Sequence, residues 1–171
     1  MTASSSLGFT ADRTMRSAQN LYEAGLITYL RTDGINISTS PNTGEPFSEE
    51  NPGPPPLEEI RNVISEKFGK KFLSDDVRVY KSKVKNSQEA HEAIRPTNIK
   101  TYPEKINLGQ DEQKLYTLVW NRTVASQMSN SEHERKKIVV HSENDKFVLN
   151  ASSRKTIFEG CLLYTSDAAD E

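Results

Sequence analysis

A tyrosine and an arginine lie two positions apart in a segment that is rich in β-branched and aromatic side chains. The pattern predicts a short strand over residues 26–33 that ends at Gly34. On a strand, side chains two apart share a face, so Ile27, Tyr29 and Arg31 would point one way. A phenol with its usual pKa near 10 is a weak nucleophile, and a neighbouring guanidinium can both favour the phenolate and hold a phosphate. The pair therefore predicts phosphoryl transfer, with an ordinary half-buried tyrosine and a solvated arginine as the alternative.

A second cluster of polar residues lies further along the chain. His91 and Arg95 are four positions apart within Gln88-Glu89-Ala90-His91-Glu92-Ala93-Ile94-Arg95-Pro96-Thr97. The pattern predicts a short helix over 87–94 that ends before the proline, which would place both side chains on one face. That face could bind a DNA backbone phosphate, or it could be a solvated helix end. A zinc-protease site is excluded, because Arg95 occupies the place of the second histidine and cannot bind a metal.

Three other segments carry apolar side chains at helical spacing, and they would form the body that positions these clusters. They are residues 11–24, 57–68 and 111–128. Thr10 is suited to cap the first of them, and Gly25 is suited to end it. The sequence therefore predicts that the Tyr29 segment follows directly from a capped amphipathic helix.

The rest of the chain divides into a proline-rich stretch and a strand-rich end. Residues 38–56 contain too many prolines for a regular element and are predicted to form an exposed loop. Strand-forming residues at 137–140 and 146–151 flank a polar turn and predict a β-hairpin. Because the composition shifts from helical to strand-like before the hairpin, we place a domain boundary near residues 129–136.

Composition narrows the class of protein. The 171 residues contain 34% hydrophobic and 27% charged side chains, without an apolar run long enough to span a membrane or act as a secretory signal. The single cysteine, Cys161, cannot form an internal disulfide. These features favour a cytoplasmic protein. The formal net charge of -2 is lower than that of most free-standing nucleic-acid-binding domains.

The last eleven residues, 161–171, differ in character from the rest of the chain. They contain three acidic and no basic residues, and without them the formal net charge is +1. We interpret residues 161–171 as a non-native tail, with a genuine acidic terminus as the alternative, and exclude them from the prediction of the fold.

Three motifs, in this order, resemble the catalytic-tyrosine domain of bacterial DNA topoisomerase I, a type IA enzyme. They are Leu7-Gly8-Phe9, then Leu21-Tyr22-Glu23-Ala24-Gly25-Leu26-Ile27-Thr28-Tyr29-Leu30-Arg31-Thr32-Asp33, then Ser87 followed by the cluster at 88–97. The resemblance covers about residues 3–160. It implies that Tyr29 becomes linked to a 5′ DNA phosphate and that Arg31 contacts the scissile phosphate. It also implies that His91 and Arg95 lie near the active site and help to bind DNA.

The resemblance also implies a fold and a set of partners. The expected class is α+β, with a mainly helical winged-helix-like domain over residues 1–130 and the start of a β-rich arch domain over 131–160. The family's reaction needs Mg²⁺, whose acidic ligands belong to a domain that this sequence does not contain, so we expect the fragment alone to be inactive. The expected partner is DNA, especially single-stranded, with no membrane association and a monomeric enzyme.

Two features depart from the family's pattern. Gly34 stands where a serine is common, and the 38–56 loop is longer than usual. Neither change affects Tyr29 or Arg31. Two alternatives stay open on the residues alone: a non-catalytic winged-helix DNA-binding module in which Tyr29 is structural, and a fragment without activity. The near-neutral charge disfavours the first of them.

Overall fold

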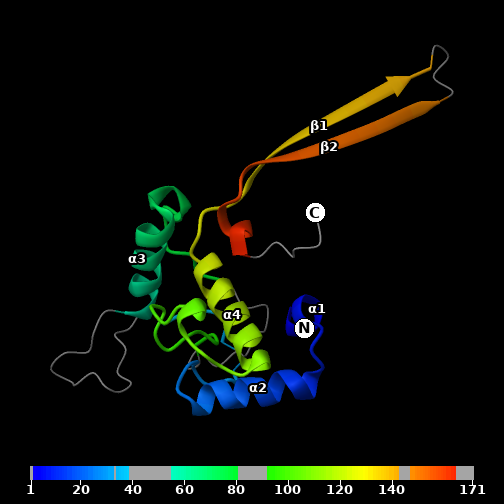
Figure 1. The fold of residues 1–171 in the computed structure, drawn as a ribbon. Helices are drawn as coiled ribbons and strands as arrows, with labels where there is room; N and C mark the ends of the chain where they lie inside the picture. Colours follow the sequence, from blue (N-terminus) through cyan, green and yellow to red (C-terminus); the bar gives the residue numbers. More distant parts are fainter. Residues whose placement is uncertain (1, 33, 39–54, 81–91, 143–146, 165–171) are drawn as a thin grey trace.

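The protein has an α+β fold in which a helical body carries a projecting β-hairpin (Figure 1). The computed structural model describes residues 2–32, 34–38, 55–80, 92–142 and 147–164. Within these residues four α-helices precede a two-stranded antiparallel sheet. The elements are α1 (Thr2–Leu7), α2 (Ala11–Glu23), α3 (Pro56–Phe68), α4 (Gln110–Ala125), β1 (Glu132–His141) and β2 (Val148–Phe158). The expected fold class is therefore confirmed.

The three longer helices begin and end where local chemistry favours it. The Thr10 side chain accepts a hydrogen bond from the Arg13 amide at 3.3 Å and caps α2. Pro56 occupies the first turn of α3, where its missing amide costs nothing, and Gly69 follows the last turn. Asp111 lies in the first turn of α4, where an acidic side chain favours the helix dipole. The three helices predicted from the spacing of apolar residues are therefore confirmed.

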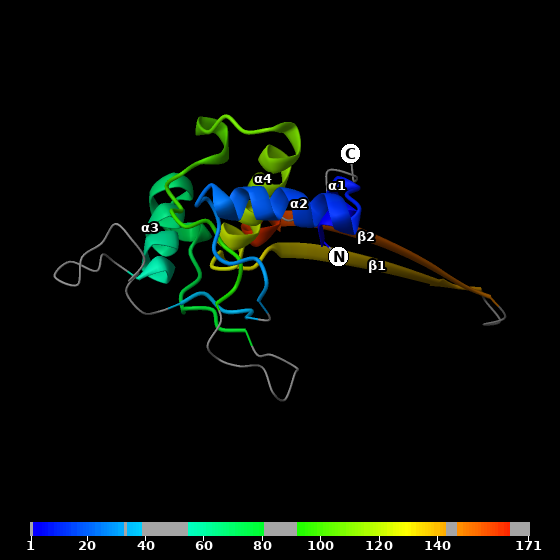
Figure 2. The same ribbon diagram turned by 90° about the horizontal axis from the view of Figure 1, so that it is seen from below.

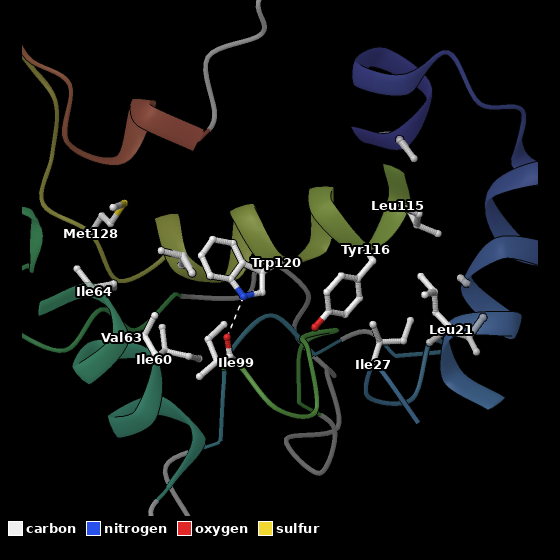
Figure 3. Packing of buried hydrophobic residues seen from close by; sticks show 14 of the residues in the cluster. Leu21, Ile27, Ile60, Val63, Ile64, Ile99, Leu115, Tyr116, Trp120 and Met128 are labelled. Atoms are coloured by element: carbon white, nitrogen blue, oxygen red, sulfur yellow. Dashed lines mark hydrogen bonds between the residues drawn. The ribbon is translucent and has the colours of Figure 1, made fainter. Parts of the chain in front are cut away.

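The hydrophobic core forms around α4, which lies between α2 and α3 (Figure 3). Trp120 and Tyr116, both on α4, are 1% and 0% exposed, and each satisfies its polar atom with a backbone carbonyl. The Trp120 indole donates to the Ile99 carbonyl at 2.9 Å, and the Tyr116 hydroxyl donates to the Thr101 carbonyl at 2.8 Å. The segment between residues 95 and 102 is thereby fixed to the core.

One predicted element is wrong, and another is contradicted at its end. Residues 26–32 do not form a strand, because the pairing there is limited to an isolated bridge between Ile27 and Pro96. Residues 92–94 are not helical, so the predicted helix over 87–94 does not reach its expected end. The rest of that helix, including His91, lies outside the described residues. Most of the predicted 38–56 loop lies outside them as well.

The hairpin is longer than the sequence predicted. β1 and β2 pair over ten positions from Glu132 opposite Phe158 to His141 opposite Val148. Figure 2 shows β1 and β2 extending from the helical body on the side away from α3. Along β1 and β2 nearly every residue is exposed on both faces of the ribbon. The domain boundary near residues 129–136 stays a prediction.

The end of the described chain returns to the helical body. The short 3₁₀ helix Gly160–Tyr164 follows β2, and the Cys161 amide donates to the Ser129 carbonyl at 2.8 Å. The ring of Tyr164 meets that of Trp120 edge-on, with 5.7 Å between centroids. Two of the residues interpreted as a non-native tail, Cys161 and Tyr164, thus pack against the core, and the origin of the tail stays a prediction. None of the helices described is both long and apolar enough to cross a membrane.

Candidate functional site

A tight turn at Gly25 sets the direction of the Tyr29 segment. Gly25 has φ of +69°, and its amide donates to the Tyr22 carbonyl at 2.9 Å. The Leu26 amide donates to the Leu21 carbonyl, also at 2.9 Å. This pair of bonds is the Schellman arrangement, which closes a helix and reverses the chain over its last turn. As a result the residues after α2 fold back against the core instead of continuing into solvent.

Tyr29 lies on the surface between two buried anchors. Ile27 is 2% exposed and Leu30 is 8% exposed, whereas Tyr29 is 48% exposed. Figure 3 shows Ile27 pointing into the core near Leu21 and Tyr116. The segment is therefore fixed on both sides of a tyrosine that solvent can reach.

The ring of Tyr29 contacts a second tyrosine. It meets the ring of Tyr22 on α2 edge-on, with 5.5 Å between centroids. Arg31 is exposed as well. The prediction that Ile27, Tyr29 and Arg31 point one way is wrong, since Ile27 is buried while Tyr29 and Arg31 are exposed. Alternation along a strand does not describe this segment.

The second cluster pairs directly with the Tyr29 segment. The Thr28 amide donates to the Arg95 carbonyl at 2.9 Å, and the Arg95 amide donates to the Thr28 hydroxyl at 3.0 Å. The Thr97 amide donates to the Leu26 carbonyl at 3.1 Å, and the Thr97 hydroxyl donates to the Gly25 carbonyl at 2.6 Å. The structure thus brings together two motifs that are about 70 positions apart in the sequence.

The pairing continues past Tyr29. The Thr32 hydroxyl donates to the Glu92 carbonyl at 3.0 Å, and the Ala93 amide donates to the Asn36 carbonyl at 2.8 Å. The Asn36 side chain then bonds to both backbone groups of Tyr80, each at 2.8 Å. Hydrogen bonds therefore support the tyrosine segment on both sides of Tyr29.

Arg95 is a buried residue in this arrangement. It is 4% exposed, and its guanidinium binds both carboxylate oxygens of Glu92, at 2.9 Å and 3.1 Å. A further N–H donates to the Pro96 carbonyl at 2.9 Å. The sequence predicts Arg95 on an exposed helical face with His91. For Arg95 that placement is wrong, because residues 92–94 are not helical and Glu92 and the Pro96 carbonyl enclose its guanidinium. The geometry favours a role in holding the backbone over direct contact with a phosphate.

Residues that sequence reasoning missed carry much of this support. Thr28, Asn36 and Glu92 were not singled out, because a threonine, an asparagine and a glutamate in polar surroundings usually face solvent. For Glu92 a signal was present: it lies three positions before Arg95, a spacing that allows an ion pair. Nothing in the local sequence identifies Thr28 or Asn36, whose partners are 44 to 67 positions away.

Metal binding has no candidate site in the described part of the chain. There, no three side chains of histidine, cysteine, aspartate or glutamate are grouped so that they could hold an ion. The described residues of this chain therefore do not fit a Mg²⁺ site of their own.

The comparisons with known proteins agree on one kind of protein. A family model described as "DNA topoisomerase" matches residues 1–171. The chain is 40% identical over 179 aligned positions to DNA topoisomerase 1 of Rickettsia bellii, covering 99% of this chain and 20% of the relative. It is 42% identical to the DNA topoisomerase 1 of Helicobacter pylori strain 26695, covering 92% of this chain and 20% of that protein.

A solved structure has a similar fold. The full-length topoisomerase I from Thermotoga maritima superposes with a TM-score of 0.72 at 32% identity, covering 99% of this chain and 26% of the solved one. The present chain spans about a fifth of the length of the curated relatives that it matches.

Proposed function

Because this chain belongs to the bacterial DNA topoisomerase I family, of type IA, we propose that it supplies the DNA-cleaving tyrosine to a longer, cytoplasmic enzyme that relaxes DNA. The observation that carries the proposal is the exposure of Tyr29 between the buried side chains of Ile27 and Leu30. An attacking hydroxyl must be reachable by a phosphate and must also be held in place, and this arrangement provides both.

In the proposed reaction the Tyr29 hydroxyl oxygen attacks a phosphorus atom of one DNA strand. A bond forms between that oxygen and phosphorus, the bond from phosphorus to the 3′ oxygen breaks, and the phenolic proton passes to that oxygen, directly or through solvent. The 5′ phosphate is then esterified to Tyr29, and the other strand passes through the gap. Attack by the 3′ hydroxyl on the phosphotyrosine reverses each step. Because one phosphate ester replaces another, no ATP is consumed.

Arg31 is proposed to bind the scissile phosphate. Its planar guanidinium can donate two parallel hydrogen bonds to phosphate oxygens, which orients the phosphorus toward Tyr29 and offsets charge in the transition state. His91 stays a proposed DNA contact on the strength of the resemblance. We assign Arg95 to holding the backbone of the tyrosine segment, with direct DNA contact as the alternative. Mg²⁺, which would help to offset phosphate charge, would need ligands from outside this chain.

The test uses full-length enzyme carrying this segment, with Tyr29→Phe and Tyr22→Phe as matched variants. The enzyme is mixed with a single-stranded oligonucleotide labelled at its 3′ end, and the reaction is stopped with denaturant. Since the proposed ester is at the 5′ phosphate, the 3′ label should stay with the protein in wild type and in Tyr22→Phe. Tyr29→Phe should bind the strand but form no adduct.

Adduct in the Tyr29→Phe variant would place the nucleophile elsewhere. Binding without any adduct in the wild-type enzyme would support the rival function, a non-catalytic DNA-binding module. Labelled protein from a 5′-labelled strand, in place of the 3′-labelled one, would show the opposite polarity of cleavage.

A further inference from the structure

The two faces of the β1–β2 hairpin differ in charge. In an antiparallel ladder, directly opposed side chains share a face, as do residues two apart on one strand. The register pairs Arg135 with Arg154 and Lys137 with Ser152, so these side chains share one face. We call it the basic face, and by the same register it consists of His133, Arg135, Lys137, Val139 and His141 on β1 and of Val148, Asn150, Ser152, Arg154 and Thr156 on β2. A contact of 3.2 Å between His133 Nδ1 and Thr156 Oγ1 supports the assignment.

The opposite face carries a carboxylate beside its lysines. Lys155 is opposite Glu134 in the register, and the Lys136 ammonium lies 3.7 Å from a Glu134 carboxylate oxygen. Among the described residues, Arg135, Lys137 and Arg154 of the basic face form no ion pair. The positive charge that no carboxylate offsets is therefore concentrated on the basic face.

A directly opposed pair of arginines is unfavourable in an isolated hairpin, because like charges repel across the ladder. An anion bound over the pair would offset that repulsion. Arg135, Lys137, Asn150 and Ser152 also line a shallow depression on this surface. Their side chains offer several hydrogen-bond donors to one ligand.

We propose that the basic face binds the sugar–phosphate backbone of a single DNA strand, away from the phosphate that Tyr29 attacks. Guanidinium groups match phosphate oxygens in shape and charge, and amide and hydroxyl side chains commonly donate to phosphates. Apart from His133 and His141 the basic face has no aromatic side chain on which a base could stack, so we expect the contact to depend on charge and not on base sequence. The Cβ atoms of opposed residues such as Arg135 and Arg154 are about 5 Å apart across the ladder, and Lys137 follows about 7 Å further along β1. These three positions span an area that matches the backbone of one DNA strand.

The position of the hairpin separates this contact from the cleavage site. Figure 1 shows the hairpin leaving the helical body on the side away from α2, whose C-terminal turn leads into the Tyr29 segment. The inference rests on the proposed function to the extent that the parent enzyme binds DNA, but it does not depend on which residue cleaves.

The test measures binding without cleavage, in full-length enzyme that also carries Tyr29→Phe. One variant adds Arg135→Gln and Arg154→Gln on the basic face. The matched control adds Lys136→Gln and Lys155→Gln, which remove the same charge from the same strands on the opposite face. A third variant, Arg135→Lys with Arg154→Lys, keeps the charge. Affinity for a fluorescent single-stranded oligonucleotide is measured as salt concentration is raised.

The basic-face variant should bind at least about tenfold more weakly at low salt. Its plot of log affinity against log salt should flatten by about 1.4, since each lost phosphate contact on a single strand contributes about 0.7. The opposite-face control should lose less than about twofold, and the lysine variant should keep most of the salt slope. All the altered side chains are exposed, so every variant should melt within a few degrees of the parent.

Three results would overturn the proposal. Equal losses in the two glutamine variants would mean that only net charge matters. Unchanged binding in the basic-face variant would remove the contact altogether. A loss seen with a duplex probe and not with the single strand would contradict the assignment to single-stranded DNA. Adduct formation by enzyme with Tyr29 intact is measured separately, so failure of the proposed cleavage function would be recognised independently.

Discussion

Thr28 and Arg95 are joined by hydrogen bonds that run in both directions. The Thr28 amide donates to the Arg95 carbonyl at 2.9 Å, and the Arg95 amide donates to the Thr28 hydroxyl at 3.0 Å. The same hydroxyl also reaches the Ala93 carbonyl at 3.2 Å. The residue immediately before Tyr29 is thus fixed to a segment that is distant in sequence, and this fixation can be tested separately from cleavage.

Thr28→Val should destabilise the chain by about 1–3 kcal/mol, because the Arg95 amide loses its acceptor in a partly buried position. Valine has nearly the same shape as threonine, so the loss of stability can be assigned to the missing hydroxyl. Thr28→Ser keeps the hydroxyl and should recover most of the stability. Denaturant unfolding of the chain measures both variants. Equal stability of Thr28→Val and wild type would show that the hydroxyl is dispensable.

Arg95→Met should be more damaging than Glu92→Gln. It leaves the Glu92 carboxylate without its bidentate partner and removes the bond to the Pro96 carbonyl, for a cost of about 3 kcal/mol. Glutamine at 92 can still accept a hydrogen bond from Arg95, so Glu92→Gln should cost about 1 kcal/mol. Unfolding free energies of the two single variants and the double variant give the coupling between the residues.

A further variant, Arg95→Lys, separates the two roles considered for this residue. If Arg95 holds the tyrosine segment, Arg95→Lys should slow adduct formation in the full-length enzyme while affinity for a single-stranded oligonucleotide stays within about twofold of wild type. If Arg95 binds phosphate directly, affinity and its salt dependence should fall together.

Arg31→Lys should slow cleavage more than it weakens binding. Lysine keeps the charge but cannot form the planar, bidentate contact that is proposed to align the scissile phosphate. Loss of a charge-assisted hydrogen bond costs about 1.5–3 kcal/mol, which corresponds to a rate reduction of roughly one to two orders of magnitude. Single-turnover cleavage of a labelled strand at equal occupancy measures the effect. Rates within about twofold of wild type would reduce Arg31 to a solvated residue.

Gly25→Ala should destabilise the turn before the tyrosine segment by about 1–2 kcal/mol. The cost comes from the backbone, since φ is +69° and a Cβ there would meet no atom within 4 Å. Gly25→Asn should cost less, because asparagine tolerates the left-handed region better than alanine does. Thermal unfolding of both variants provides the comparison, and an alanine variant as stable as wild type would contradict it.

Burial raises the pKa of Tyr116 to about 12, above the ordinary value of 10. Between pH 10 and 12 the unfolded chain loses this proton before the folded one does, so stability is fully present below pH 10 and falls as pH rises through that window. Tyr116→Phe should flatten this part of the profile, at the loss of the hydrogen bond to Thr101. Unfolding free energies from pH 8 to 12 test it, and parallel profiles for the two proteins would rule it out.

Local patterns were sufficient to locate the main elements and the candidate nucleophile. Helical spacing identified α2, α3 and α4, and Thr10 and Gly25 marked the ends of α2. The hairpin followed from strand-forming residues on either side of a polar turn. These features depend on neighbours within a few positions, so the sequence determines them directly. The motif around Tyr29 gave a resemblance that the family comparisons bear out.

Long-range pairing decided what surrounds the candidate site. The tyrosine segment had the composition of a strand, but the Thr28 hydroxyl takes the Arg95 amide and reaches the Ala93 carbonyl, so side-chain bonds replace the ladder that a strand needs. From the sequence, Arg95 is expected to be a surface charge. In the structure, Glu92 and backbone carbonyls enclose its guanidinium. Burial of a charge depends on partners that the fold supplies. Likewise, most of the hydrogen-bond partners that hold residues 25–38 come from residues 92–97. The sequence by itself therefore identified Tyr29 as the candidate nucleophile, and only the tertiary structure decided how that residue is held.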